Sequence, residues 1–136
     1  MATVRKEFNV AVSADRAWGA VRDFGALHEQ LVPGFVTAAH LEGNDRVVTF
    51  FSGTVLRERL VTLDDEQRRL VWSIVDGPYS HHNGAVQVFA EIGGGCRMVW
   101  TADFLPHEAA TRTSELMEQG SKAIKQTLER AQTDAT

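Results

Sequence analysis

The hydrophobic and polar positions along the chain predict seven strands. Each of these segments is alternating or rich in apolar residues, and short breakers rich in Gly, Asp or Asn separate most of them, as hairpin loops require. The strands are predicted at residues 3–10, 35–41, 46–51, 54–63, 69–75, 82–92 and 96–105. Because parallel neighbours need long crossover connections, the last six are expected to form an antiparallel meander.

Apolar residues at helical spacing predict three helices. The first begins after Ser13, which is a suitable N-cap, and ends near residues 24–25. A second, short helix is expected at residues 26–31, before the Pro-Gly pair at 33–34. The third covers about residues 107–131, and its apolar stripe repeats every four residues.

These elements predict a single α+β domain over residues 1–136. A sheet must bury its apolar face, and only the C-terminal helix is long enough to cover it. We therefore expect a curved seven-stranded antiparallel sheet wrapped around that helix, with two short helices after the first strand. A strongly curved sheet can leave a gap against the helix, and a functional site is expected in this gap.

Composition narrows the function classes. Of the 136 residues, 43% are hydrophobic and 24% are charged, which is typical of a soluble globular domain. The net charge of −4 disfavours nucleic acid as a partner. No apolar run reaches the ~18 residues of a membrane span, and the N-terminus has no secretory signal pattern. With one cysteine, Cys96, no internal disulfide is possible, and a cytoplasmic location is expected.

The local sequence resembles the START and birch-pollen-allergen-like (SRPBCC) superfamily, and within it the bacterial polyketide cyclase/dehydrase-like branch. The resemblance covers about residues 2–131, and the segments that carry it are residues 13–18, 21–25, 55–60, 63–65, 68–74, 95–100 and 104–106, with Gly120 on the long helix. Members of this superfamily include lipid carriers, hormone receptors and aromatase/cyclases. The resemblance implies a helix-grip fold, a closed hydrophobic pocket between sheet and helix, and no nucleotide or metal cofactor.

Glu58 is the first candidate functional residue. It shares a strand face with Leu56 and Leu60, so its carboxylate is expected among apolar neighbours. Such a group can bind a ligand hydroxyl or act as a general acid or base. The resemblance adds that hormone receptors of the superfamily hold their ligand through water with a glutamate at a similar place. The alternative is a structural ion pair with Arg57, Arg59 or a neighbouring strand.

His82 is the second candidate, as a polar group at the pocket mouth that titrates near neutral pH. The alternative for the pair His81 and His82 is an exposed loop. His40, His82 and Glu58 lack the spacing of metal ligands, so no metal site is predicted.

The remaining candidates are pocket-lining positions chosen by strand parity and helix spacing, except Tyr79. Its loop resembles the family's gate region, and the alternative is a plain exposed loop. Trp72 and Trp100 either stack on a flat ligand or fill the core. Phe50 and Phe51 face opposite sides, and Phe51 is placed in the pocket. Gly120 is explained either by room for a ligand or by close packing of the helix. The predicted ligand-binding set is Phe51, Leu56, Glu58, Leu60, Trp72, Ile74, Tyr79, His82, Val86, Met98, Trp100, Gly120 and Ile124.

Three functions fit these patterns. The favoured one is binding of a bulky hydrophobic or aromatic molecule, such as a lipid or a polyketide-like compound, in the internal cavity. The second is a polyketide cyclase or dehydratase that uses Glu58 and His82 as catalytic residues. The third is a ligand-free interaction module whose cavity is filled by side chains. Whether the protein is an enzyme, and whether it forms a homodimer, is left open by the sequence.

Overall fold

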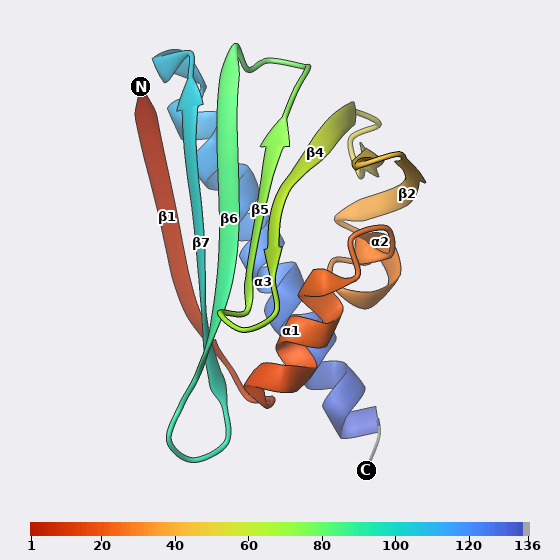
Figure 1. Ribbon diagram of the computed structural model, residues 1–136, viewed down its shortest axis with the longest axis vertical. Coiled ribbons are helices and arrows are strands. Elements are labelled where there is room, and N and C mark those ends of the chain that lie inside the picture. Colours follow the sequence, from red (N-terminus) through yellow and green to blue (C-terminus); the bar gives the residue numbers. More distant parts are fainter. Residues whose placement is uncertain (135–136) are drawn as a thin grey trace.

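A computed structural model describes the backbone of residues 1–134 and the side chains of residues 1–130. The seven strands form one sheet in which every pair of neighbours is antiparallel, in the order β1-β7-β6-β5-β4-β3-β2. The strands are β1 (Ala2–Val10), β2 (Val36–Glu42), β3 (Asp45–Phe50), β4 (Val55–Asp64), β5 (Arg69–Ile74), β6 (His81–Ala90) and β7 (Cys96–Leu105). The predicted meander is therefore present, and β1 extends it beside β7 (Figure 1).

The helices follow the predicted capping and spacing. Helix α1 (Ala14–Arg22) begins after Ser13, whose Oγ accepts a hydrogen bond from the backbone N–H of Arg16 at 3.1 Å. Helix α2 (Leu27–Gln30) is a single turn. A 3₁₀ turn, η1 (His107–Ala109), precedes the long helix α3 (Ala110–Asp134). None of the described helices combines the length and the apolar character needed to cross a membrane.

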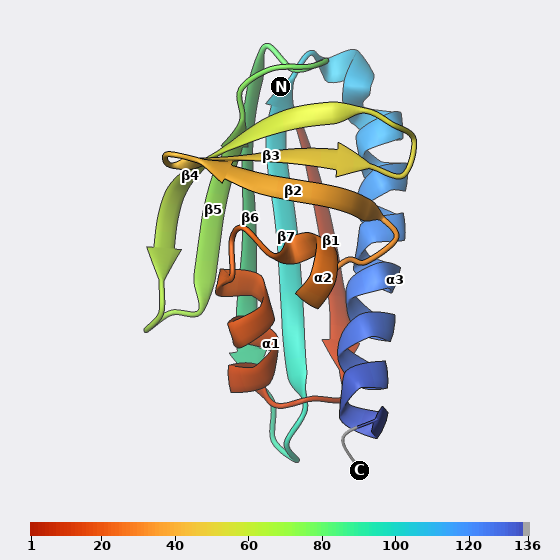
Figure 2. The same cartoon turned by 90° about the vertical axis from the view of Figure 1, so that its right-hand side faces the viewer.

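The sheet curves strongly along its strand order. In Figure 2, β1, β6 and β7 run along the long axis of the molecule, whereas β2 and β3 cross it almost at right angles. The register shift between Leu60 and Thr62 on β4 falls between these two halves of the sheet, and such irregularities increase local twist. Helix α3 runs along the concave side and packs mainly on β1.

The interior is divided unequally between two hydrophobic clusters. The larger one joins α1 and α2 to the sheet and to the end of α3, through residues such as Val21, Met98 and Leu128. The smaller one surrounds Phe104 and Met117, near the beginning of α3. The seven-stranded helix-grip architecture confirms the predicted fold class.

Candidate functional site

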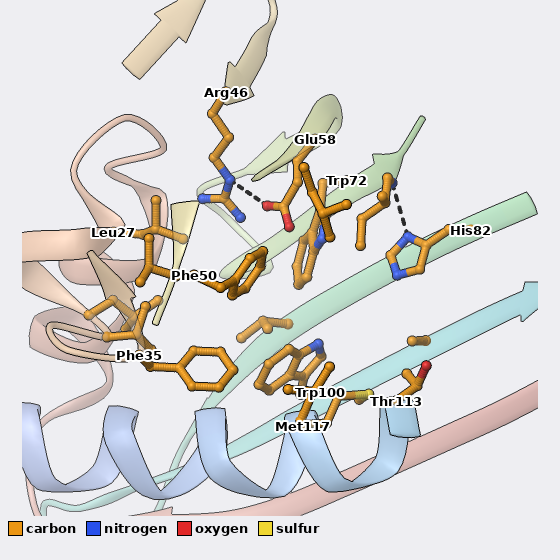
Figure 3. Close-up of a pocket in the computed structure, with 18 of the residues that line it drawn as sticks. Leu27, Phe35, Arg46, Phe50, Glu58, Trp72, His82, Trp100, Thr113 and Met117 are labelled. Carbon is orange, nitrogen blue, oxygen red and sulfur yellow. Dashed lines mark hydrogen bonds and ion pairs between the residues drawn. The ribbon is translucent and has the colours of Figure 1, made fainter. Parts of the chain in front are cut away.

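A partly open cavity lies between the curved sheet and the helices. Its volume is about 120 Å³, and side chains from β2 to β7, from α2 and from α3 line it (Figure 3). Most of the predicted pocket positions line this cavity, namely Leu56, Glu58, Trp72, Ile74, Tyr79, His82, Val86, Trp100 and Ile124. Strand parity identified most of them, because the inward residues of β4 to β7 share one face of the sheet. Ile124 followed from helix spacing, and Tyr79 from the resemblance of its loop to the family's gate region. Contact of these residues with a ligand stays a prediction.

Glu58 forms a buried ion pair with Arg46 from the neighbouring strand β3. Its Oε1 accepts a hydrogen bond from Arg46 Nε at 2.7 Å, and the two residues are only 5% and 4% exposed. Arg46 Nη1 also donates to the carbonyl oxygen of Phe24 at 3.2 Å, and the guanidinium lies over the Phe24 ring at 4.1 Å. The alternative of an ion pair with a neighbouring strand is therefore the arrangement present, and it neutralises the carboxylate charge inside the apolar wall.

His82 is buried rather than placed at an open mouth. Its Nδ1 accepts a hydrogen bond from the backbone N–H of Ile74 at 3.1 Å. Burial, together with the nearby His81, lowers the pKa of His82 from 6.5 to about 4, and Asp103 offsets this only in part. The expectation that His82 titrates near neutral pH is therefore wrong, because desolvation disfavours the imidazolium. At pH 7 the ring is neutral and carries its proton on Nε2, since Nδ1 is an acceptor.

Tyr79 and Thr113 close one side of the cavity. The Tyr79 hydroxyl and Thr113 Oγ1 are hydrogen-bonded at 2.7 Å, which ties the β5–β6 loop to α3. On the other side of this contact lies a groove of about 310 Å³. The cavity and the groove share Tyr79 and Thr113, together with Phe50, Leu56 and Leu116. A shift of these shared side chains would join the two spaces.

Two predicted positions on β3 and β4 lie outside the cavity. Phe51 is 48% exposed in the turn after β3, and Phe50 faces the cavity instead. The alternation along β3 allows only one of the two to point inward, and the prediction chose the wrong one. Leu60 is partly buried against the main hydrophobic cluster, beside the register shift on β4, and does not reach the cavity.

Met98 and Gly120 are also away from the cavity wall. Met98 is fully buried in the larger hydrophobic cluster, so it fills the core beside α1. At Gly120, an added Cβ would lie 2.8 Å from the Trp100 ring and 3.3 Å from Phe35. Of the two explanations for this glycine, the structure agrees with close packing, because Trp100 occupies the space that a side chain would need.

Sequence reasoning missed several lining residues. Arg46 and Phe50 share the inward face of β3 with Val48, so the same parity argument would have found them. Thr113 and Met117 lie about two turns and one turn of α3 before Gly120, on the helix stripe that faces the sheet. Leu27 on α2 also lines the cavity. Hydrophobic periodicity could not predict this, because a single helical turn is too short to show a repeat.

The chemistry of the cavity is that of an apolar container with a few polar groups. Its polar members are the Arg46–Glu58 pair, the neutral His82 and the Tyr79–Thr113 hydroxyl pair, while Trp72 and Trp100 provide aromatic surface with ring centroids 6.3 Å apart. Within the described part of the chain, no three His, Cys, Asp or Glu side chains gather in a group that could hold a metal ion.

A helix-grip fold with an apolar cavity between its sheet and its long helix is typical of proteins that bind hydrophobic molecules. The chain belongs to the family of polyketide cyclase/dehydrase and lipid transport proteins, whose model matches residues 1–135. This match confirms the resemblance to the SRPBCC superfamily. No curated protein matches the chain.

Solved structures from bacteria and a plant share this fold. A protein from Thermobifida fusca is 31% identical, with a TM-score of 0.78 and coverage of 96% of this chain and 95% of that chain. A protein from Bacillus thuringiensis is 20% identical, with a TM-score of 0.84 and coverage of 93% and 98%. Norcoclaurine synthase from Thalictrum flavum, solved with a transition-state analogue, is 19% identical, with a TM-score of 0.72 and coverage of 96% of both chains.

Proposed function

We propose that the protein binds a hydrophobic small molecule in the cavity between the sheet and α3. The observation that carries this proposal is the partly enclosed, mostly apolar cavity whose few polar groups include those of Arg46, Glu58 and His82. Preformed apolar cavities with a small number of polar groups are typical of ligand sites. The family to which the chain belongs includes lipid transport proteins, which supports the same class of function.

The size of the cavity limits what it holds without rearrangement. Its volume of about 120 Å³ is below the roughly 300 Å³ at which pockets for drug-sized ligands begin and close to the roughly 150 Å³ of a cavity that binds benzene. We therefore propose that one ring of the ligand occupies the cavity. A bulkier ligand would extend past the Tyr79–Thr113 contact into the adjoining groove.

The cyclase or dehydratase alternative has less support from the geometry. It requires Glu58 and His82 to transfer protons, but Glu58 Oε1 is held by Arg46 at 2.7 Å. The lowered pKa of His82, about 4, makes it a weak base at neutral pH. The two functions differ in their products, because a carrier releases its ligand unchanged whereas a dehydratase releases a molecule lighter by one water. Mass spectrometry of the bound and released compound distinguishes them.

Filling the cavity tests the binding proposal. Ala102 is 2% exposed and lines the cavity, so Ala102→Leu places three additional carbons in the space. We expect the affinity for toluene, used as a one-ring apolar probe, to fall at least about tenfold, because most of the apolar contact area is lost. Chemical-shift titration measures the affinity, and circular dichroism checks that the variant is folded.

Ala38→Leu is the matched control for this experiment. It makes the same substitution at an exposed position of β2, so toluene binding is expected to equal that of the wild type. Undiminished binding of toluene by folded Ala102→Leu would show that hydrophobic molecules bind elsewhere.

Native mass spectrometry of the purified wild-type protein then gives the mass of any natural ligand that remains bound.

A further inference from the structure

The tryptophans of this protein differ in what their indole N–H groups contact. Trp18, on α1 and away from the cavity, donates from Nε1 to Asp65 Oδ1 at 2.8 Å. Trp72 and Trp100 line the cavity, and neither indole nitrogen has a hydrogen-bond partner among the described residues. The indole N–H of a buried tryptophan usually finds an acceptor. Two donors inside one cavity therefore lack the partner that the third tryptophan has.

His82 adds a third donor to the same cavity. Because Nδ1 accepts the N–H of Ile74 at 3.1 Å, the neutral ring carries its proton on Nε2. In the part of the chain that the structure describes, no acceptor is found for this Nε2–H. Figure 3 shows the second nitrogen of His82 and the indole nitrogens of Trp72 and Trp100 on the ring edges that face the space between the three side chains.

The acceptors in the cavity wall are largely engaged with other protein groups. Glu58 Oε1 accepts from Arg46 Nε, and the hydroxyls of Tyr79 and Thr113 are hydrogen-bonded to each other at 2.7 Å. Glu58 Oε2 accepts from none of the three N–H groups.

Among the described residues, the fully buried side-chain nitrogen and oxygen atoms without a partner are His28 Nδ1 and Ser121 Oγ. The N–H groups of Trp72, Trp100 and His82 therefore keep accessible surface, which a molecule in the cavity can contact. The cavity therefore offers three hydrogen-bond donors, and a bound molecule can supply the acceptor. The Arg46–Glu58 pair has no net charge, so the site suits a neutral acceptor.

We propose that the ligand carries a neutral carbonyl-type oxygen that accepts hydrogen bonds from the N–H groups of Trp72, Trp100 and His82. The ligand class is thus a hydrophobic ketone, quinone or ester whose oxygen points into the cavity and whose carbon skeleton fills the apolar remainder. This inference rests on the proposed function, because it concerns the molecule bound in that cavity. A pure hydrocarbon would leave all three donors unpaired.

Two molecules of equal shape test the inference. Cyclohexanone and methylenecyclohexane are neutral six-membered rings that differ in one group, a carbonyl oxygen against a methylene. The ketone is better hydrated than the hydrocarbon, so their affinities cannot be compared directly in one protein. We therefore compare the ratio of the two dissociation constants between the wild type and a variant, in which the hydration difference cancels. Trp72→Phe/Trp100→Phe keeps aromatic rings but removes two donors. We expect the preference for the ketone to fall about tenfold in this double variant.

Trp18→Phe is the matched control, because it removes an indole N–H that donates to Asp65 outside the cavity. It is expected to leave the ratio unchanged. A second readout uses the wild-type protein alone. Cyclohexanone should shift the indole N–H resonances of Trp72 and Trp100 downfield, methylenecyclohexane should not, and the Trp18 resonance should stay in place with both.

The outcomes separate this inference from the proposed function. If both rings bind in the cavity but the double variant keeps the wild-type ratio and the two indole resonances do not respond to the ketone, the carbonyl preference is overturned and hydrophobic binding stands. If neither ring binds to the wild-type protein, both the inference and the proposed function fail. A reduced ratio together with downfield shifts at Trp72 and Trp100 supports the inference.

Discussion

Replacing Arg46 by methionine is expected to lower the free energy of unfolding by about 3–5 kcal/mol. The substitution leaves the Glu58 carboxylate, which is 5% exposed, in an apolar wall without its partner at 2.7 Å. Removing one member of a buried pair costs far more than the pair contributes, because the remaining charge is desolvated without compensation. Urea unfolding followed by far-ultraviolet circular dichroism measures the change.

A second substitution separates the uncompensated charge from the loss of packing. In Arg46→Met/Glu58→Leu both charges are gone, so the double variant is expected to recover most of the stability lost in Arg46→Met. Arg112→Met serves as the exposed control, since Arg112 lies 3.8 Å from Glu115 at the surface and its loss should change stability by at most about 0.5 kcal/mol. If the double variant is as unstable as Arg46→Met, the packing of Arg46 on Phe24, and not the charge, dominates.

The position of Glu58 could be predicted from the sequence, whereas its partner Arg46 could not. Alternation along β4 placed Glu58 inside, because a strand face is fixed by a period of two. The partner of Glu58 depends on the register of β3 against β4, in which Arg46 lies directly opposite. Register is a property of the pairing between strands and not of one strand, so the sequence did not single out Arg46. The same period of two excludes Arg57 and Arg59, because it places them on the face opposite to Glu58. Both instead pair with Asp45 on the other face.

The extent of the cavity was also beyond what periodicity could predict. Met98 and Trp100 have the same parity on β7, yet Met98 is fully buried in the core and Trp100 lines the cavity. Parity determines the face of a strand, whereas the position along the strand decides which helix covers it. The seven strands and the long helix were predictable because hairpin breakers and a repeat every four residues are local signals.

The stability of the protein is expected to fall as the pH is lowered from about 6.5 to 4, because of His82. Burial lowers the pKa of His82 from 6.5 to about 4, so the folded state resists the proton that the unfolded state binds. Stability linked to this group is fully present above the unfolded value and is lost as the pH falls toward the folded value. The pKa difference corresponds to a loss on the order of 3 kcal/mol at pH 4.

The measurement is the free energy of unfolding in urea at several pH values between 4 and 7, in wild type and in His82→Gln. The variant removes the titrating ring, so its stability should fall less steeply over this range. Carboxylates such as Glu7 and Asp65, whose pKa values are lowered by Arg partners, also destabilise the protein on acidification, but they do so equally in both proteins. His81→Gln, a change at the exposed neighbouring position, should retain most of the wild-type slope, because burial and not His81 is the largest cause of the lowered pKa of His82. Equal slopes for His82→Gln and wild type would mean that His82 accepts a proton in the folded state as readily as in water. Protonation of the folded protein would place a second proton on Nδ1, so the hydrogen bond that Nδ1 accepts from the backbone N–H of Ile74 would be lost.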